Sequence, residues 1–227
     1  TQVTPLDTYA LVLDGAAVLQ GKVPAALARA GAGRLLQAWP AVRRLATGRT
    51  APRGYDVRSL DRFGDRHDAL WQRVRDQHRC AVVRDASYLN WKYVTQPGQD
   101  FVRLEVASRG EAAGVAVFTL SPADRAYRYR RAVVVDCVVR HDDDAAVRAL
   151  LAALRETARA RGAALVSFDL IGPSLAAHLL ADGYVKRDAT RVLLVATGAA
   201  SPEVSDAMRS PEAWFVTRGD SDIDRPW

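Results

Sequence analysis

Two strands flank a long amphipathic helix between Tyr129 and Leu170, and this unit constrains the fold more than any other part of the sequence. Apolar residues mark the helix at positions i, i+3, i+4, i+7 and i+11: Val147, Leu150, Leu151, Leu154 and Ala158. Three consecutive aspartates, Asp142 to Asp144, precede the helix as caps, and Gly162 follows its end. A helix that joins two strands makes them parallel neighbours through a right-handed crossover. The sequence therefore predicts a parallel pair of strands.

The pattern from Gly54 onward predicts a mixed sheet with helices on its faces. In chain order we expect a strand (Tyr55 to Leu60), a helix (Phe63 to His78), a short helix (Ala86 to Val94), three antiparallel strands (Phe101 to Ala107, Ala113 to Leu120, Tyr129 to Val139), the long helix, a strand (Ala164 to Leu170), a helix (Pro173 to Ala181) and further strands (Tyr184 to Asp188, Arg191 to Ala196, Trp214 to Thr217). The predicted fold class is α/β, an α+β mixed sheet, because hairpins give antiparallel neighbours and the crossover gives a parallel one.

The first 50 residues are expected to form an N-terminal appendage to a main domain over residues 54–227. We expect a strand from Tyr9 to Asp14 and helices at Pro24 to Ala30 and Arg34 to Leu45, the second interrupted by Pro40. A loose string over residues 47–54 is typical of a linker.

The helix expected at Arg34 to Leu45 has two interpretations. It places arginines beside large apolar residues: Arg34, Arg43 and Arg44 beside Leu35, Leu36, Trp39 and Val42. Such a helix can lie on a membrane surface, or it can pack on its own domain. The second arrangement is the commoner one, and we expect it here.

Composition excludes several classes of protein. Of the 227 residues, 49% are hydrophobic and 26% are charged, which fits a globular domain with an appendage and excludes disorder, collagen and coiled coil. The apolar run from Tyr9 ends at Asp14, and no stretch reaches the roughly 18 to 20 apolar residues that a membrane-spanning helix needs. Cys80 and Cys137 are expected as buried thiols in a reducing compartment. We therefore expect a soluble, cytoplasmic chain without a membrane span.

The positive charge of the chain is scattered rather than gathered. The formal net charge is +6, from 32 basic and 26 acidic residues, and no run of five or six basic residues occurs. Charge alone is weak support for nucleic-acid binding, so we do not expect that partner. The oligomeric state cannot be derived from these features.

Several stretches resemble a known superfamily. Residues 84–93 (RDASYLNWKY) are similar to an RDxxYLNWRY segment, and residues 179–184 (LLADGY) are similar to an L-x-x-x-G-F ending of a helix. Val134 to Val139 leads into the long helix, and the tail from Trp214 to Asp224 holds a Trp and a GDSD string. With the order of elements, these stretches resemble the GNAT superfamily of N-acyltransferases over about residues 54–227. Since that branch includes tandem units, the resemblance implies that residues 1–50 could be the end of a preceding GNAT-like unit.

The resemblance implies a cosubstrate, acetyl-CoA or another acyl-CoA, at the start of the long helix. In the superfamily a loop of form [Q/R]-x-x-G-x-[G/A] binds pyrophosphate there through backbone N–H groups. Here Asp142 stands in the Gln or Arg place, and neither glycine is present. The positions implied for cofactor binding are Val138, Arg140, Ala145, Val147 and Arg148.

The acidic loop leaves two alternatives open for this cosubstrate. Asp142, Asp143 and Asp144 place up to three negative charges where a diphosphate would dock, a repulsion on the order of several kcal/mol. Either the cofactor shifts by a few residues toward Arg140 or Arg148, or the fold persists with its cofactor site lost.

Asp136 is the candidate general base. Acyl transfer to an amine needs a base that takes the ammonium proton, and burial among valines would raise the pKa of this carboxyl. Strand alternation predicts that it faces away from Val135 and Cys137. The alternative is a structural acid paired with a buried arginine. Asp169, in the next strand, is the second choice.

Ser174 and His178 are the candidate donors to the leaving thiolate. The superfamily usually places a tyrosine on the penultimate helix for this role, and these two residues are what that helix offers. The alternatives are a first-turn helix residue for Ser174 and a half-exposed surface histidine for His178.

Three aromatic residues, Tyr88, Trp91 and Tyr93, could line an acceptor groove, although helical spacing of aromatics more commonly means core.

We expect no metal site, because the Cys and His residues lack zinc spacing. The carboxylates of Asp220, Asp222 and Asp224 lack the Gly and the Glu of a calcium loop, so we expect a solvated tail.

These expectations give two candidate functions. The first is an N-acyltransferase that transfers an acetyl or acyl group from acyl-CoA to a small-molecule or peptide amine. The alternative is a catalytically inactive GNAT-fold module that serves as a binding or structural unit.

Overall fold

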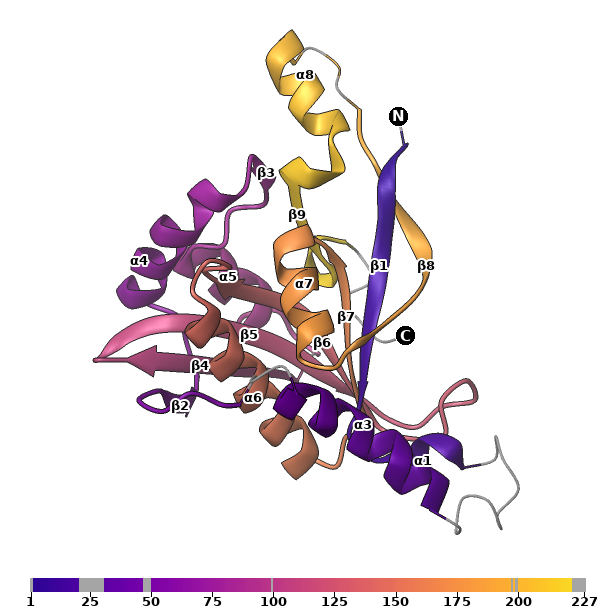
Figure 1. Ribbon diagram of the computed structural model, residues 1–227. Helices are drawn as coiled ribbons and strands as arrows, with labels where there is room; N and C mark the ends of the chain where they lie inside the picture. Colours follow the sequence, from indigo (N-terminus) through magenta and orange to yellow (C-terminus); the bar gives the residue numbers. More distant parts are fainter. Residues whose placement is uncertain are drawn as a thin grey trace.

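The computed structural model describes residues 2–20, 31–46, 50–98, 100–196, 198 and 200–221. Over these residues it has a nine-stranded mixed sheet whose main path runs β2-β4-β5-β6-β7-β1-β8 (Figure 1). The strands are β1 (Gln2–Val12), β2 (Asp56–Ser59), β3 (Cys80–Ala81), β4 (Phe101–Ser108), β5 (Glu111–Ser121), β6 (Arg131–Val139), β7 (Leu165–Ile171), β8 (Val185–Leu194) and β9 (Trp214–Thr217). The β4-β5-β6 meander is antiparallel and the β6-β7 pair is parallel, so the predicted mixed sheet is confirmed.

Helices cover both faces of the sheet. They are α1 (Gly15–Leu19), α3 (Gly33–Ala46), α4 (Asp65–Val74), α5 (Ala86–Tyr93), α6 (Asp144–Ala160), α7 (Pro173–Ala181) and α8 (Pro202–Arg209), with short 3-10 helices η2 (Arg75–Gln77), η3 (Pro211–Ala213) and η4 (Arg218–Asp220). Leu150 of α6 and Leu175 of α7 pack on one face, in a core that includes Phe168. Leu70 of α4 and Leu89 of α5 pack on the other face. Two cores therefore lie back to back across the sheet.

Three differences from the expected elements have physical causes. The helix α3 continues through Pro40, which is buried and packs against Gly183, so tertiary packing overrides the proline. The two strands expected after residue 184 form one strand, β8. Pairing with β1 extends from Val185 to Leu194 and makes the strand continuous. The helix α8 was not expected, although Ser201 and Pro202 supply its cap and first residue. The helix expected at Pro24 to Ala30 lies outside the described residues.

The N-terminal strand β1 lies inside the sheet. It pairs antiparallel with β7 on one side and with β8 on the other. The segment expected as an appendage thus contributes a strand to the same sheet as the main domain. That residues 1–50 end a preceding GNAT-like unit stays a prediction. No helix among the described residues combines the length and the apolar character needed to cross a bilayer.

The parallel strands β6 and β7 separate after four residue pairs, and β9 fills the opening between them. Pairing runs from Arg131 opposite Leu165 to Val134 opposite Phe168. Beyond that point β9 pairs antiparallel with β7, and it also pairs with β3 (Figure 1). The strand predicted at Trp214 to Thr217 is confirmed, and it closes the sheet where two parallel strands diverge.

Candidate functional site

A bulge in β6 sets the direction of Asp136 at this opening. Val117 of β5 pairs with Asp136, but the next residue of β5 pairs with Val134, so Val135 is an extra residue in β6. Val135 belongs to the core on the α5 side, and Cys137 belongs to the core on the α6 side. Asp136 therefore faces away from Cys137, as predicted. The expectation that it also faces away from Val135 was wrong, because the bulge interrupts the alternation.

Arg84 is the centre of a buried polar network in the opening. Its side chain has no exposed surface, and its Nε donates to Asp136 Oδ1 at 2.7 Å. Its Nη2 donates to Asp220 Oδ2 at 2.5 Å, and its Nη1 donates to the carbonyl oxygen of Val82 at 2.8 Å. The guanidinium also lies 4.9 Å from the ring centre of Phe215. One arginine thus ties β6 to the C-terminal segment.

The C-terminal segment approaches β6 closely at Gly219. A Cβ atom on this glycine would lie 2.1 Å from Tyr93 Oη and 2.7 Å from the carbonyl oxygen of Val135, so only glycine fits. The next residue, Asp220, accepts the backbone N–H of Thr217 at 2.8 Å. Burial raises the pKa of the Asp220 carboxyl. The expectation of a solvated tail was wrong for Asp220, because its carboxylate is the second partner of Arg84; Asp222 and Asp224 lie outside the described residues.

The contacts of Asp136 match the structural alternative rather than a free base. Its Oδ1 accepts from Arg84 and from the backbone N–H of Cys137 at 2.8 Å, and its Oδ2 accepts the Tyr93 hydroxyl at 2.9 Å. The side chain is 1% exposed. Both oxygens accept hydrogen bonds from donors of the protein, and the carboxylate has almost no exposed surface through which an amine could reach it. Burial and the Asp136 charge raise the pKa of Tyr93 well above its ordinary value, so this tyrosine remains a donor.

The second choice for the base, Asp169, is also held by cations. Its Oδ2 accepts from Arg218 at 2.6 Å and from Arg191 at 3.0 Å. Its Oδ1 accepts the Thr8 hydroxyl at 2.7 Å. Asp169 thereby ties β7 to β1, β8 and η4.

The start of α6 is capped by its own aspartates. Asp143 Oδ1 accepts the backbone N–H of Ala146 at 2.9 Å, which uses a donor that a bound pyrophosphate would need. Asp142 is paired with Arg140, and hydrogen bonds from Arg140 lower the pKa of this carboxyl to about 2. Asp144 lies 2.9 Å from Arg148 Nε. The three acids are therefore held by cap and ion-pair contacts instead of filling the opening themselves.

The five residues implied for cofactor binding are divided among different environments. Val138 and Val147 are buried in the two opposite cores. Arg140 is engaged by Asp142, and Arg148 by Asp144 and by the carbonyl oxygen of Thr50 at 3.1 Å. Ala145 is partly exposed in the first turn of α6. These positions do not converge on one cradle for a diphosphate.

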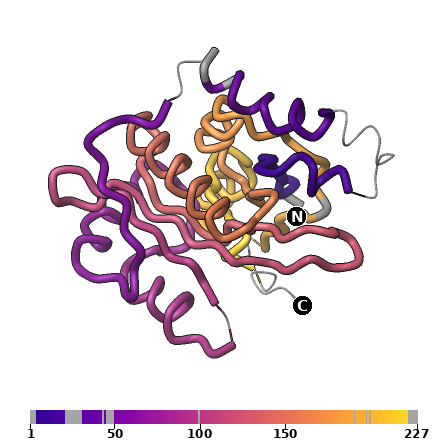
Figure 2. The backbone as a smooth tube through the Cα atoms, turned by 90° about the horizontal axis from the view of Figure 1, so that it is seen from below, coloured from indigo at the N-terminus to yellow at the C-terminus, as the bar shows by residue number. Residues whose placement is uncertain are grey.

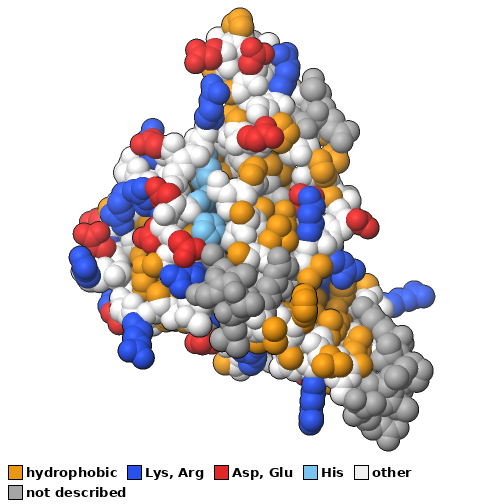
Figure 3. All heavy atoms as spheres, in the orientation of Figure 1, with side chains coloured by type: hydrophobic (Ala, Val, Ile, Leu, Met, Phe, Trp, Pro, Cys, Tyr) orange, Lys and Arg blue, Asp and Glu red, His pale blue; other side chains and the backbone are white. Residues whose placement is uncertain are grey.

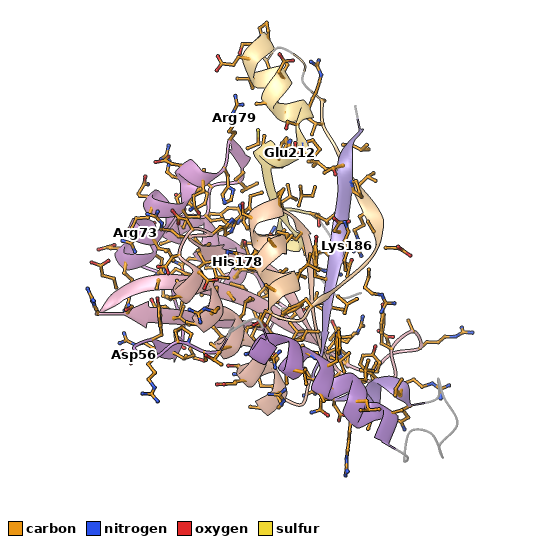
Figure 4. The ribbon with its side chains drawn as sticks, in the orientation of Figure 1. Asp56, Arg73, Arg79, His178, Lys186 and Glu212 are labelled. Carbon is orange, nitrogen blue, oxygen red and sulfur yellow. The ribbon has the colours of Figure 1, made fainter. Side chains whose placement is uncertain are left out.

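The two candidate donors lie on α7, and His178 belongs to a histidine cluster. Ser174 is exposed in the first turn. His178 Nε2 donates to the carbonyl oxygen of His141 at 2.8 Å, and its Nδ1 lies 3.4 Å from Asp144 Oδ1. Figure 4 labels His178 on α7, and Figure 3 shows histidine side chains at the surface between α4 and α7. The structure therefore places Asp136 and His178 in two separate clusters.

Phe215 joins these two clusters. His78 stacks on its ring with centroids 4.5 Å apart, and His141 lies 5.3 Å from it. Burial lowers the pKa of His78 to about 4 and that of His141 to about 3. Both histidines are neutral near pH 7 and act there as aromatic packing around β9.

The three aromatic residues expected at an acceptor groove point to different places. Tyr93 is 1% exposed and belongs to the core, whereas Trp91 is 56% exposed. Tyr88 lies beside Trp91, with ring centroids 5.9 Å apart. Tyr88 packs against the core that contains Tyr93, so the core alternative applies to both tyrosines, and of the three aromatic residues only Trp91 points outward.

Sequence reasoning missed the partners that close the opening. Arg84 and Asp220 both stood in stretches quoted for the resemblance, but 136 positions separate them, and no local pattern pairs them. No local pattern in the sequence indicates that His78 and His141 pack around Phe215 either. Within the described residues, no group of three or more His, Cys, Asp or Glu side chains could hold a metal ion.

Comparison with known proteins adds a limited likeness. No family model and no curated protein matches the chain. Solved structures that match in three dimensions include a conserved protein of unknown function from Staphylococcus epidermidis (11% identity, TM-score 0.45, 82% of this chain and 59% of that one). They also include a GCN5-related N-acetyltransferase from Anabaena variabilis (9% identity, TM-score 0.45, 74% of this chain and 33% of that one). A third is an aminoglycoside acetyltransferase from an uncultured soil metagenomic sample (13% identity, TM-score 0.33, 48% of this chain and 72% of that one).

The chain thus spans about three fifths and one third of the length of the first two neighbours. Two of the three neighbours are acetyltransferases by description.

Proposed function

We propose that this GNAT-like domain carries no acyl transfer of its own and serves as a binding or structural module. The observation that supports this most is the position of β9, which pairs with β7 at the opening where a thioester arm would have to lie. Gly219 and Asp220 then continue the closure against β6 and Arg84. An acyl-CoA could enter only by displacing a paired strand and a buried ion pair.

The donor set at α6 supports the same proposal. A diphosphate is bound by free backbone N–H groups and by cations that have no other partner. Here the Ala146 N–H is capped by Asp143, and the nearby cations Arg140 and Arg148 are each paired with an aspartate. The residues present therefore do not fit an acyl-CoA at this position.

Titration calorimetry with acetyl-CoA tests the proposal, with 3′-phospho-ADP as the matched ligand that lacks the thioester arm. We expect no heat of binding from either ligand and no release of free thiol when small-molecule or peptide amines are added. Binding of acetyl-CoA but not of 3′-phospho-ADP would overturn the proposal, because the arm would then have its own site. Thiol release that depends on an added amine would overturn it as well.

A second candidate function is an amine N-acyltransferase whose cofactor is shifted away from the opening. A cleft of about 580 Å³ beside the start of α6 favours it. Three arginines line this cleft, Arg73, Arg109 and Arg140, together with acids that include Asp142 to Asp144. Under this candidate, Arg140→Gln should abolish acetyl-CoA binding and Arg191→Gln, on β8, should not. Equal binding by both variants, or none by the unaltered chain, excludes it.

A further inference from the structure

Residues 50–54, which lead from α3 toward β2, form an exposed stretch with little hydrogen bonding. Arg53 and Gly54 are both exposed, and nothing lies within 4 Å of the place where a Cβ atom on Gly54 would be. Among the described residues, the one hydrogen bond to this stretch runs from Arg148 Nη1 to the carbonyl oxygen of Thr50, at 3.1 Å. Figure 2 shows this stretch at the periphery of the molecule. Its backbone can therefore change conformation without breaking packed structure.

The bond between Arg53 and Gly54 has the chemistry that an arginine-specific endopeptidase recognises. Such an enzyme holds the guanidinium of the residue before the bond against a carboxylate in its specificity pocket. Within the part of the chain that the structure describes, Arg53 has no ion-pair or hydrogen-bond partner to give up. Gly54, after the bond, brings no side chain that a protease would have to accommodate.

Two other exposed arginines in turns are held by their neighbours. Next to Arg125, the Asp124 carboxylate accepts the backbone N–H of Tyr127 at 2.6 Å. The carbonyl oxygen of Arg161 accepts from Arg130 Nη1 at 3.0 Å. A protease that binds an extended backbone would have to break these bonds first, so the bond after Arg53 is the more accessible one.

The segment before this bond is anchored to the segment after it by contacts other than the peptide chain. The strand β1 pairs with β7 on one side and with β8 on the other (Figure 1). Leu11 and Leu13 are 1% and 2% exposed and belong to the main core. Arg44 Nη1 donates to the carbonyl oxygen of Asp182 at 3.2 Å. These contacts remain when the chain is cut after Arg53.

We propose that the peptide bond between Arg53 and Gly54 is a proteolytic modification site, and that the cut chain persists as two associated pieces, residues 1–53 and 54–227. In the cleavage, water gives a hydroxyl group to the carbonyl carbon of Arg53 and a hydrogen to the nitrogen of Gly54, and the bond between these two atoms breaks. The cut turns β1 from a tethered strand into a ligand of the slot between β7 and β8, so its occupancy depends on concentration. The inference goes beyond the proposed function and does not depend on it.

Limited digestion of the full chain with trypsin tests the site. Mass spectrometry should identify a large product that begins at Gly54, formed before any cut after Arg125 or Arg161. Arg53→Gln should abolish this product. Arg125→Gln is the matched control, since it removes an exposed arginine from another loop, and it should leave the product unchanged. Circular dichroism verifies that each variant is folded.

The association of the two pieces has its own readout. They should elute together from a size-exclusion column in native buffer and separate in denaturant. The melting temperature of the cut chain should rise with protein concentration, whereas that of the intact chain should not, because unfolding of the cut chain releases a separate piece.

Three results would overturn the proposal. The first is early cleavage after Arg125 or Arg161 while the bond after Arg53 stays intact. The second is separation of the two pieces in native buffer. The third is a melting temperature of the cut chain that does not change with concentration, which would mean that β1 contributes nothing to the folded state of residues 54–227.

Discussion

The opening between β6 and β7 differs from the exposed apolar face of α3, here called the α3 ridge (Leu35, Leu36, Trp39 and Val42). Charged groups are buried at the opening, whereas apolar groups are exposed at the ridge. At the opening, Arg84, Asp136 and Asp220 are removed from water and bonded to one another. At the ridge, Leu35 and Trp39 remain in water. A buried ion pair has a large desolvation cost and is strongly destabilising when one partner is removed, whereas an exposed apolar patch commonly marks an interaction surface. The contrast shows charged groups shielded from water at one place and apolar side chains left in water at another.

The largest effect is expected from Asp136→Asn, which leaves Arg84 buried with one carboxylate fewer. Removing one member of a buried ion pair costs about 3 to 5 kcal/mol. Urea denaturation should show that loss in the free energy of unfolding. Asp206→Asn, at an ion pair with Arg209 in which the aspartate is 78% exposed, should change it by less than about 1 kcal/mol. Equal losses in the two variants would mean that the opening is open to solvent.

Gly219→Ala should be the next most damaging change, because the new methyl group meets Tyr93 Oη and the Val135 carbonyl oxygen. Overpacking of this kind costs about 1 to 3 kcal/mol. A double-mutant cycle with Tyr93→Phe sharpens the test. The two losses should add to more than the loss in the double variant, since phenylalanine lacks the hydroxyl that the methyl meets. Simple additivity would contradict the close approach of η4 to α5.

The histidines around Phe215 should make stability depend on pH. The folded-state pKa values of His78 (about 4) and His141 (about 3) lie below the unfolded value near 6.5, so the unfolded chain binds more protons. Their contribution to stability is therefore complete above about pH 6.5 and is lost as the pH falls through about 4 for His78 and about 3 for His141. Each buried histidine contributes a slope of up to about 1.4 kcal/mol per pH unit, and His78 less because it is partly exposed.

His78→Phe isolates one of these groups, since phenylalanine keeps the stack on Phe215 without titrating. Unfolding free energies measured between pH 7 and pH 4.5 should fall less steeply in this variant. An unchanged slope would mean that His78 is solvated and not packed against β9.

The smallest effect is expected at the ridge. The double variant Leu35→Ser, Trp39→Ser should change the free energy of unfolding by less than about 1 kcal/mol, since neither side chain is buried. Thermal melts of the two proteins measure this difference. A loss of several kcal/mol would show that α3 packs through its ridge and would remove the contrast with the opening.

Periodicity was enough to predict most of the sheet. The helix α6 and the helix at Pro173–Ala181 follow from apolar spacing and from their end residues, and β9 was predicted with its bounds. Periodicity could not predict where β9 pairs, because that depends on residues distant in sequence. The position of β1 inside the sheet escaped prediction for the same reason.

The candidate site was harder to predict than the fold. A buried carboxylate such as Asp136 is expected from its apolar neighbours, but whether it is a base or an ion-pair partner depends on Arg84 and Tyr93, which lie on other elements. The alternation rule also failed at Val135, because a bulge leaves no clear trace in the sequence. Amphipathicity of α3 was visible in the sequence, yet its outward direction depends on what packs against Pro40.

Hydrogen exchange of β9 tests the closed opening most directly. The backbone amides of Val216 and Thr217 should exchange as slowly as those of β5 and β6, and excess acetyl-CoA should leave their rates unchanged. Fast exchange in β9, or rates in β9 and β6 that change together when acetyl-CoA is added, would contradict the account. The opening would then be an acyl-CoA site that β9 covers only in the absence of ligand.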